Sequence, residues 1–185
     1  MRELCRARLS GLPLPTSREL SVRAARQGSL NSYRLNPANK AATRHMEYLI
    51  GLVLALAVAG FAAVTGFERD RVFYPTVLII VAHYYVLFAA MGASGRTIAI
   101  ETAVASAFLL IAVLGFKRNL WLVAAAIAGH GVFDFFHHSL IENPGVPRWW
   151  PGFCLAFDVG FGAYVAVRQY LALRLDSESR TAVAN

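Results

Sequence analysis

A short stretch of this chain carries the residues best suited to chemistry. His130, Asp134, His137 and His138 follow one another at intervals of four, three and one residue inside an otherwise apolar segment. At about 100° per residue, a helix would place all four side chains on one face that is about 100° wide. Histidine and aspartate together are ligands for transition metals and carriers of protons, so this HxxxDxxHH pattern indicates a metal site or a proton-transfer site.

Three more ionisable residues, His83, Glu101 and Asp158, lie in other apolar segments. At a rise of about 1.5 Å per residue, Asp134 and Asp158 come about 10 to 12 Å below the same membrane surface, and His83 comes about 13 Å below it. Glu101 and His137 come about 6 Å below that surface. We therefore expect groups from four separate helices to meet in one half of the bilayer.

The apolar segments hold no lysine or arginine, although charged carboxylates inside a membrane are costly and need compensation. The remaining partners are protons, imidazolium groups or a divalent cation. The predicted metal ligands are His130, Asp134, His137, His83 and Asp158, with zinc as the first choice of ion and iron or manganese next. The candidate catalytic residues are Asp134, Glu101 and Asp158, acting as general bases or proton donors.

Structural roles compete with these assignments for several of the residues. His83 can serve as a hydrogen-bond donor between helices, and Glu101 can sit at a helix N-terminus, where negative charge is favoured. His137 and His138 can reach the headgroup zone. Asp134 and Asp158 are short and deep, so they favour function most strongly.

The elements that position these residues follow from composition. Of 185 residues, 57% are hydrophobic and 16% charged, which is typical of a membrane protein. Five stretches are long enough to cross a bilayer, for which about 20 residues suffice: 48–67, 72–94, 97–116, 119–141 and 149–167. Two cysteines and no CxxC pair exclude a disulfide framework and a structural zinc motif. We predict an all-α fold, a five-helix transmembrane bundle.

Two local patterns predict how the last two helices are joined and packed. The sequence Asn143-Pro144-Gly145-Val146 predicts a type II turn, with proline at its second position and glycine at its third. Gly152, Ala156 and Gly160 recur every four residues, which predicts a face for close packing against a neighbouring helix.

The basic excess of the chain is confined to its N-terminal part. Residues 1–45 hold nine arginines and lysines against two acids, whereas residues 46–185 hold nine of each. We predict a disordered, Arg-rich tail over 1–45. Three explanations of this tail stay open: a targeting presequence, a tail attracted to anionic lipid, or an upstream extension of a protein that starts at Met46, which we favour because the first apolar run follows directly after Met46. A membrane domain over 46–175 and a C-terminal tail over 176–185 follow. The basic tail has no aromatic platform, so we expect no specific nucleic-acid partner.

Four stretches resemble a family of small bacterial integral-membrane proteins of unassigned function: residues 65–76, 115–121, 129–138 and 146–158. The resemblance covers Met46 to about Leu173 and implies a bacterial inner (plasma) membrane location. Counted from Met46, two basic residues lie on one side of the bundle and seven on the other, which predicts a cytoplasmic C-terminus.

A fainter likeness is to the ceramidase-like membrane hydrolases, in which histidines and an aspartate hold zinc inside a helix bundle. It implies a site built from His83, His130, Asp134 and His137. Those hydrolases have seven helices and a paired HxxxH, whereas this chain has five spans and HxxxD.

Four hypotheses about function follow from these residues. The first is a metal-dependent hydrolase that acts on a membrane lipid. The others are a transporter component that conducts protons or metal ions, which with five spans requires a homodimer; a metal-free lipid isomerase; and an accessory membrane protein without chemistry.

Overall fold

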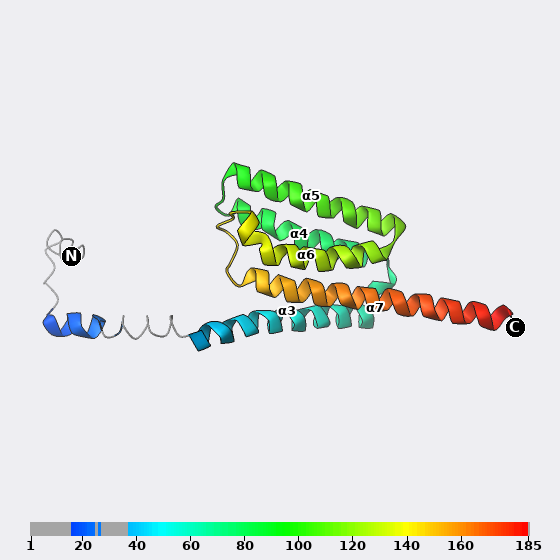
Figure 1. Ribbon diagram of the computed structural model, residues 1–185, viewed down its shortest axis with the longest axis horizontal. Coiled ribbons are helices and arrows are strands. Elements are labelled where there is room, and N and C mark those ends of the chain that lie inside the picture. Colours follow the sequence, from blue (N-terminus) through cyan, green and yellow to red (C-terminus); the bar gives the residue numbers. More distant parts are fainter. Residues whose placement is uncertain (1–15, 25, 27–36, 185) are drawn as a thin grey trace. The chain divides into compact units, whose positions relative to one another are not determined.

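The computed structural model describes residues 16–24, 26 and 37–184. The chain divides into two compact units, Met1–Thr43 and Arg44–Asn185, and each is described by itself. The successive elements are α3 (Pro37–Thr65), the 3₁₀ turn η1 (Phe67–Arg69), α4 (Phe73–Ala90), α5 (Gly95–Arg118), α6 (Leu120–Leu140) and α7 (Trp150–Ala184) (Figure 1). The described residues contain no strand.

Five helices of the described part are long and apolar enough to cross a membrane. They comprise residues His45–Thr65, Phe73–Ala90, Gly95–Arg118, Leu120–Leu140 and Trp150–Ala182. The predicted all-α bundle of five membrane helices is thereby confirmed. Phe135 and Phe136, which lie between the polar residues of the fourth helix, are exposed by 49% and 53%, as a lipid-facing surface requires.

The predicted tail, 1–45, falls largely outside the described residues. Within the first unit, residues 17–24 are helical and exposed. The Thr16 amide donates to Glu19 Oε2 at 2.8 Å, and the Glu19 amide donates to Thr16 Oγ1 at 3.4 Å. This reciprocal pair is a capping box, a local signal for the start of a helix. Helix α3 likewise begins at Pro37, before the predicted first span, because proline suits the first helical turn.

Short caps and turns define the ends of the membrane helices. The Ser94 side chain accepts a hydrogen bond from the Thr97 amide at the start of α5, and the Asn119 side chain accepts one from the Trp121 amide at the start of α6. Gly66 adopts a φ of 79° between α3 and η1, a conformation that favours glycine.

Helices α6 and α7 form the centre of the second unit, and α6 is also flanked by α4 and α5 (Figure 1). Small and branched residues fill their contact, with Val123 and Ile127 of α6 and Phe161 and Val165 of α7 fully buried. Since α6 carries most of the predicted site, its central place in the bundle buries that site.

The predicted small-residue face of α7 is confirmed, and it packs against α3. A Cβ at Gly160 would lie 3.0 Å from Leu52 Cδ1 and 3.6 Å from Ala55 Cβ. A Cβ at Gly152 would lie 3.5 Å from the Tyr48 ring. These contacts hold α3 close to the outer side of α7.

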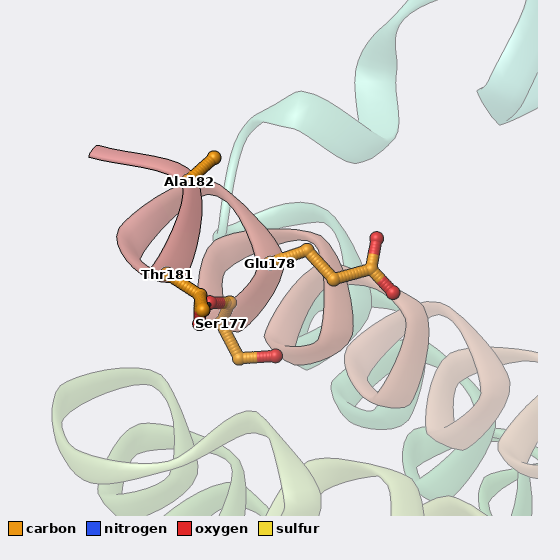
Figure 2. Close-up of a pocket in the computed structure, with 4 residues that line it drawn as sticks. All are labelled: Ser177, Glu178, Thr181 and Ala182. Carbon is orange, nitrogen blue, oxygen red and sulfur yellow. Dashed lines mark hydrogen bonds between the residues drawn. The ribbon is translucent and has the colours of Figure 1, made fainter. Parts of the chain in front are cut away.

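Helix α7 extends past the predicted end of the fifth span at Val167 and continues to Ala184. Its residues from 171 to 182 are exposed, and Arg180 forms an ion pair with Asp176 at 2.9 Å, one turn earlier. This segment contains no proline or glycine, so the helix continues beyond the apolar stretch. An open pocket near its end, lined by Ser177, Glu178, Thr181 and Ala182, contains none of the predicted site residues (Figure 2).

The loop between α6 and α7 turns where it was predicted to turn, but the turn type was wrong. The Val146 amide donates to the Asn143 carbonyl at 3.2 Å, which closes the turn. Type II needs a positive φ at the third residue, and among the described glycines only Gly66 has one. Glycine serves a different purpose at position 145, because a Cβ there would lie 2.1 Å from the Phe88 carbonyl oxygen of α4.

Candidate metal centre

Three predicted ligands converge at the contact between α6 and α7. His130 and Asp134 lie one turn apart on α6, and Asp158 faces them from α7. His130 Nδ1 lies 2.8 Å from Asp158 Oδ2 and 3.5 Å from Asp134 Oδ2. One ligand atom from each residue lies within 4.8 Å of the others, a spacing compatible with a single bound ion.

The two helices approach closely enough for this because α6 has a glycine at the contact. A Cβ at Gly131 would lie 2.8 Å from Asp158 Cβ and 3.2 Å from the Cys154 carbonyl oxygen. Further along the same contact, the glycine belongs to α7. A Cβ at Gly162 would lie 2.9 Å from the Ala124 carbonyl oxygen of α6. The absence of side chains at these two positions sets the helix separation, and with it the reach of Asp158 toward His130.

The centre is fully enclosed and its oxygens lack partners. His130 is 1% exposed, and Asp134 and Asp158 are 0% exposed. Both carboxylate oxygens of Asp134, and Oδ1 of Asp158, have no hydrogen-bond partner. The arginine ion pairs of the described residues go to Glu68 and Asp176, not to this centre. Two buried carboxylates therefore face one imidazole without any cationic side chain.

Two further side chains border Asp134. The Tyr85 hydroxyl of α4 and the Cys154 thiol of α7 lie within electrostatic range of its carboxylate. The Tyr85 hydroxyl is buried and has no hydrogen-bond partner. It thus lies beside the carboxylate without a hydrogen bond of standard geometry, in a position where it can donate to Asp134 or to a ligand of the centre.

A second buried pair adjoins the centre through the same tyrosine. His137 Nε2 lies 2.8 Å from Glu101 Oε1, and the Asn143 side-chain amide donates to that oxygen at 2.9 Å and to the Tyr85 carbonyl oxygen at 3.1 Å. The rings of Tyr85 and His137 stack with centroids 4.0 Å apart. Glu101 Oε2 and His137 Nδ1 are buried without partners, so this pair retains unused capacity to accept or donate a proton.

The structure therefore divides the predicted ligand set. His130, Asp134 and Asp158 form one group, whereas His137 is held by Glu101 on α5. Glu101 and His137 were placed at the same depth from the sequence, and their direct contact confirms that estimate. His137 shares the face of His130 but lies about 10 Å further along α6, which is too far to join the same ion.

His83 lies away from the centre. Its side chain is exposed, and its Nδ1 bonds the Ile79 carbonyl oxygen of its own helix at 2.7 Å. Helix α4 instead turns Tyr85 inward, two residues later. His138 is also exposed, so only three of the four residues of the HxxxDxxHH face point into the bundle. The sequence indicated the depth of His83 in the membrane but not the rotation of α4 about its axis. That rotation turns His83 away from the site.

Sequence reasoning did not single out Tyr85 or Asn143 as functional residues. Asn143 was interpreted only as a turn residue, but it is 4% exposed and holds Glu101. One signal in the sequence could have identified Asn143. Its amide side chain follows directly after the polar residues of α6, at the same depth as Glu101.

A further polar group lies at the other end of the bundle. Glu68 of η1 accepts hydrogen bonds from the hydroxyls of Tyr74 and Tyr164 and pairs with Arg168. The carboxylate of Glu68 thus has its hydrogen-bond partners and a cation, and it links η1 and the start of α4 to α7.

The arrangement can hold a cation between α6 and α7, with an acid–base pair and a free phenol nearby. Comparison with protein-family models, with curated proteins and with solved structures finds no match for this chain. The resemblances noted from the sequence thus stay predictions, and the argument for function depends on the geometry.

Proposed function

We propose that this protein is an intramembrane metalloenzyme that hydrolyses a membrane lipid, with a divalent ion held by His130, Asp134 and Asp158. The observation that carries the proposal is the state of Asp134, a fully buried carboxylate without a hydrogen bond of standard geometry on either oxygen, beside which the His130 ring, the Tyr85 hydroxyl and the Cys154 thiol lie as polar groups. Buried polar groups are nearly always paired, so an exception at a convergent cluster points to a ligand.

Charge supports the same conclusion. A carboxylate at the centre of a membrane helix costs about 2.5 to 3.5 kcal/mol on insertion scales, and this centre brings two together. One divalent ion would neutralise both, while neutral His130 completes the ligand set. Among the described residues, no lysine or arginine pairs with these carboxylates, because the arginine ion pairs go to Glu68 and Asp176.

The distances fit an ion of the expected size. Ligand atoms at about 2.0 to 2.2 Å from a tetrahedral ion lie roughly 3.3 to 3.6 Å apart. His130 Nδ1 lies 3.5 Å from Asp134 Oδ2 and 2.8 Å from Asp158 Oδ2, so the second separation must lengthen by roughly half an ångström. Three protein ligands leave a fourth position open, as in catalytic zinc sites, and the oxygen-rich set also suits manganese or iron.

An ion at such a site lowers the pKa of a bound water and so supplies a nucleophile for hydrolysis. The surrounding residues would have separate tasks. Asp134 or Glu101 is the proposed base, and Glu101, which His137 and Asn143 hold through Oε1, keeps Oε2 free to accept a proton. The unpartnered Tyr85 hydroxyl would donate a hydrogen bond to the oxygen on which charge develops.

A metal-free proton-transfer enzyme, such as a lipid isomerase, is the second candidate. The direct contacts His130–Asp158 and His137–Glu101, both at 2.8 Å, favour it, because each already joins an acid to a base. Metal analysis separates the two candidates.

The test begins with the full chain purified in detergent and its metal content measured by mass spectrometry. We expect about one equivalent of zinc, manganese or iron, lost in Asp134→Asn and Asp158→Asn. The exposed Asp176→Asn is the matched control and should keep the metal, since it changes a carboxylate far along α7. Wild-type protein that holds no stoichiometric ion, even after incubation with Zn²⁺, would refute the metal assignment.

Activity is then measured in vesicles that contain ester-linked phosphatidylcholine or amide-linked ceramide, with release of free fatty acid as the signal. We expect release from one of these lipids that falls at least 100-fold in Asp134→Asn and survives in Asp176→Asn. Metal-loaded protein that releases fatty acid from neither would contradict the hydrolase assignment.

A further inference from the structure

An apolar groove lies on the outer side of the bundle, between α3, α4 and α7. Its volume is about 260 Å³, and its lining includes Leu54 and Val58 of α3, Ile80 and Tyr84 of α4, and Trp150 and Cys154 of α7. Ile80 is 52% exposed and Leu54 is 43% exposed, so the groove opens sideways, toward the lipid that surrounds membrane helices.

The groove runs along α4 and α7 for about two helical turns. Its lining residues on α4 run from Val77 to Tyr84, and those on α7 run from Trp150 to Phe157. Seven residues of helix correspond to a length of about 10 Å. At about 30 Å³ for a water-sized unit, the volume holds roughly nine such units, the size of part of one unbranched hydrocarbon chain.

The polar atoms of the lining are concentrated at one end. The rings of Tyr84 and Trp150 meet edge to face there, with centroids 5.3 Å apart. The indole N–H of Trp150 is buried and has no hydrogen-bond partner. This end lies at the start of α7, at the interface level where tryptophan and tyrosine are common. The remaining lining is hydrocarbon apart from the Cys154 thiol, so the groove combines an apolar length with one polar end.

The inner wall of the groove is shared with the metal centre. Cys154 lines the groove and also borders Asp134. It is 5% exposed and lies one turn before Asp158 on α7. A chain in the groove would therefore lie one side chain away from the carboxylates, on the lipid-facing side of the bundle.

We propose that this groove binds an acyl chain of a membrane lipid and brings its ester or amide linkage to the His130, Asp134 and Asp158 centre from within the bilayer. Binding of the acyl chain follows from the groove alone. Cleavage of the ester or amide linkage rests on the proposed function. The rings of Tyr84 and Trp150 would border the polar part of the lipid, and the lateral opening admits the chain without a passage through water.

The test uses the full-length protein in phosphatidylcholine vesicles that contain a phospholipid with a photoreactive diazirine near the end of one acyl chain. After illumination, cross-linked residues are located by mass spectrometry. We expect labelling concentrated on Leu54, Ile80 and Phe153, at several times the level at Val132, an exposed residue of α6 outside the groove. Labelling spread evenly over lipid-facing residues would overturn the proposal.

A matched pair of variants tests occupancy. Ile80→Trp fills the groove, whereas Leu87→Trp makes the same change at a residue of α4 that is 55% exposed and does not line the groove. We expect at least a fivefold loss of groove labelling in Ile80→Trp and none in Leu87→Trp. Equal labelling in both variants, or a cross-link between two copies of the chain through the groove, would overturn the proposal.

Metal content, measured on the same samples, separates this proposal from the proposed function. Ile80→Trp should keep the ion and lose acyl labelling, and Asp134→Asn should lose the ion and keep the labelling. Labelled protein without an ion would refute the metalloenzyme and leave the groove supported, whereas metal-loaded protein with evenly spread labelling would do the reverse.

Discussion

The separation of α6 and α7 determines whether three ligands can meet, and Gly131 controls that separation. In Gly131→Ala, the new Cβ would lie 2.8 Å from Asp158 Cβ and 3.2 Å from the Cys154 carbonyl oxygen. Carbon atoms in ordinary contact lie about 3.5 to 4.0 Å apart, so the helices must separate locally by roughly 0.7 to 1.2 Å. Neither neighbour can rotate away, because one is a Cβ and the other belongs to the backbone.

This displacement acts directly on the centre. Functional ligand sets must be held within about 0.5 Å of their productive geometry. Changes that misplace ligands through their supporting residues typically cost about 10- to 100-fold in metal affinity. We therefore expect Gly131→Ala to weaken metal binding by about that factor, and to destabilise the bundle by about 1 to 3 kcal/mol through overpacking.

Gly129→Ala provides the control on the same helix. Gly129 is exposed, and a Cβ there has no neighbouring atom within 4 Å. Both variants gain the same helix propensity, so a difference between them reports the contact alone. The assay is competition between the detergent-solubilised apoprotein and a fluorescent zinc chelator. Equal affinities for the two variants would refute the argument that close approach at Gly131 builds the centre.

Three other substitutions test separate parts of the structure. His83→Ala should leave metal content and affinity unchanged in the same assay, because this exposed side chain bonds only its own helix; a lost ion would restore it as a ligand. Asn143→Ala removes a buried donor to Glu101 and should lower the free energy of unfolding by about 1 to 3 kcal/mol, seen as a reduced Tm by circular dichroism in detergent. Gly145→Ala should destabilise far more than Gly92→Ala, since its Cβ would lie 2.1 Å from a carbonyl oxygen of α4, while no atom lies within 4 Å of a Cβ at Gly92; equal Tm values would contradict the close approach.

The sequence alone predicted the parts of the structure that depend on local pattern. Long apolar runs predicted the five membrane helices, and the spacing of His130 and Asp134 predicted that they share a face. Depth counted along a helix correctly placed Glu101 level with His137. Each of these quantities depends on one helix and its ends, so no knowledge of packing was needed.

The parts that failed depend on how helices rotate about their axes. His83 and Tyr85 lie on the same apolar helix, where nearly every residue is hydrophobic and no amphipathic pattern reveals the inner face. The structure turns Tyr85 inward and leaves His83 exposed. The role of Asn143 was likewise hidden, because a turn residue acquires a buried partner only when the loop closes over Glu101.

The contacts at the centre define the choice between an ion and protons. Asp158 Oδ2 lies 2.8 Å from His130 Nδ1, and Asp134 Oδ2 lies 3.5 Å from the same nitrogen. Without an ion, two protons are needed to neutralise the two carboxylates, one shared between the carboxyl groups and one that makes His130 an imidazolium. A divalent ion would instead contact both carboxylates and a neutral imidazole at once and balance both charges. The metal content of the purified protein therefore decides between the metalloenzyme that we propose and its metal-free alternative.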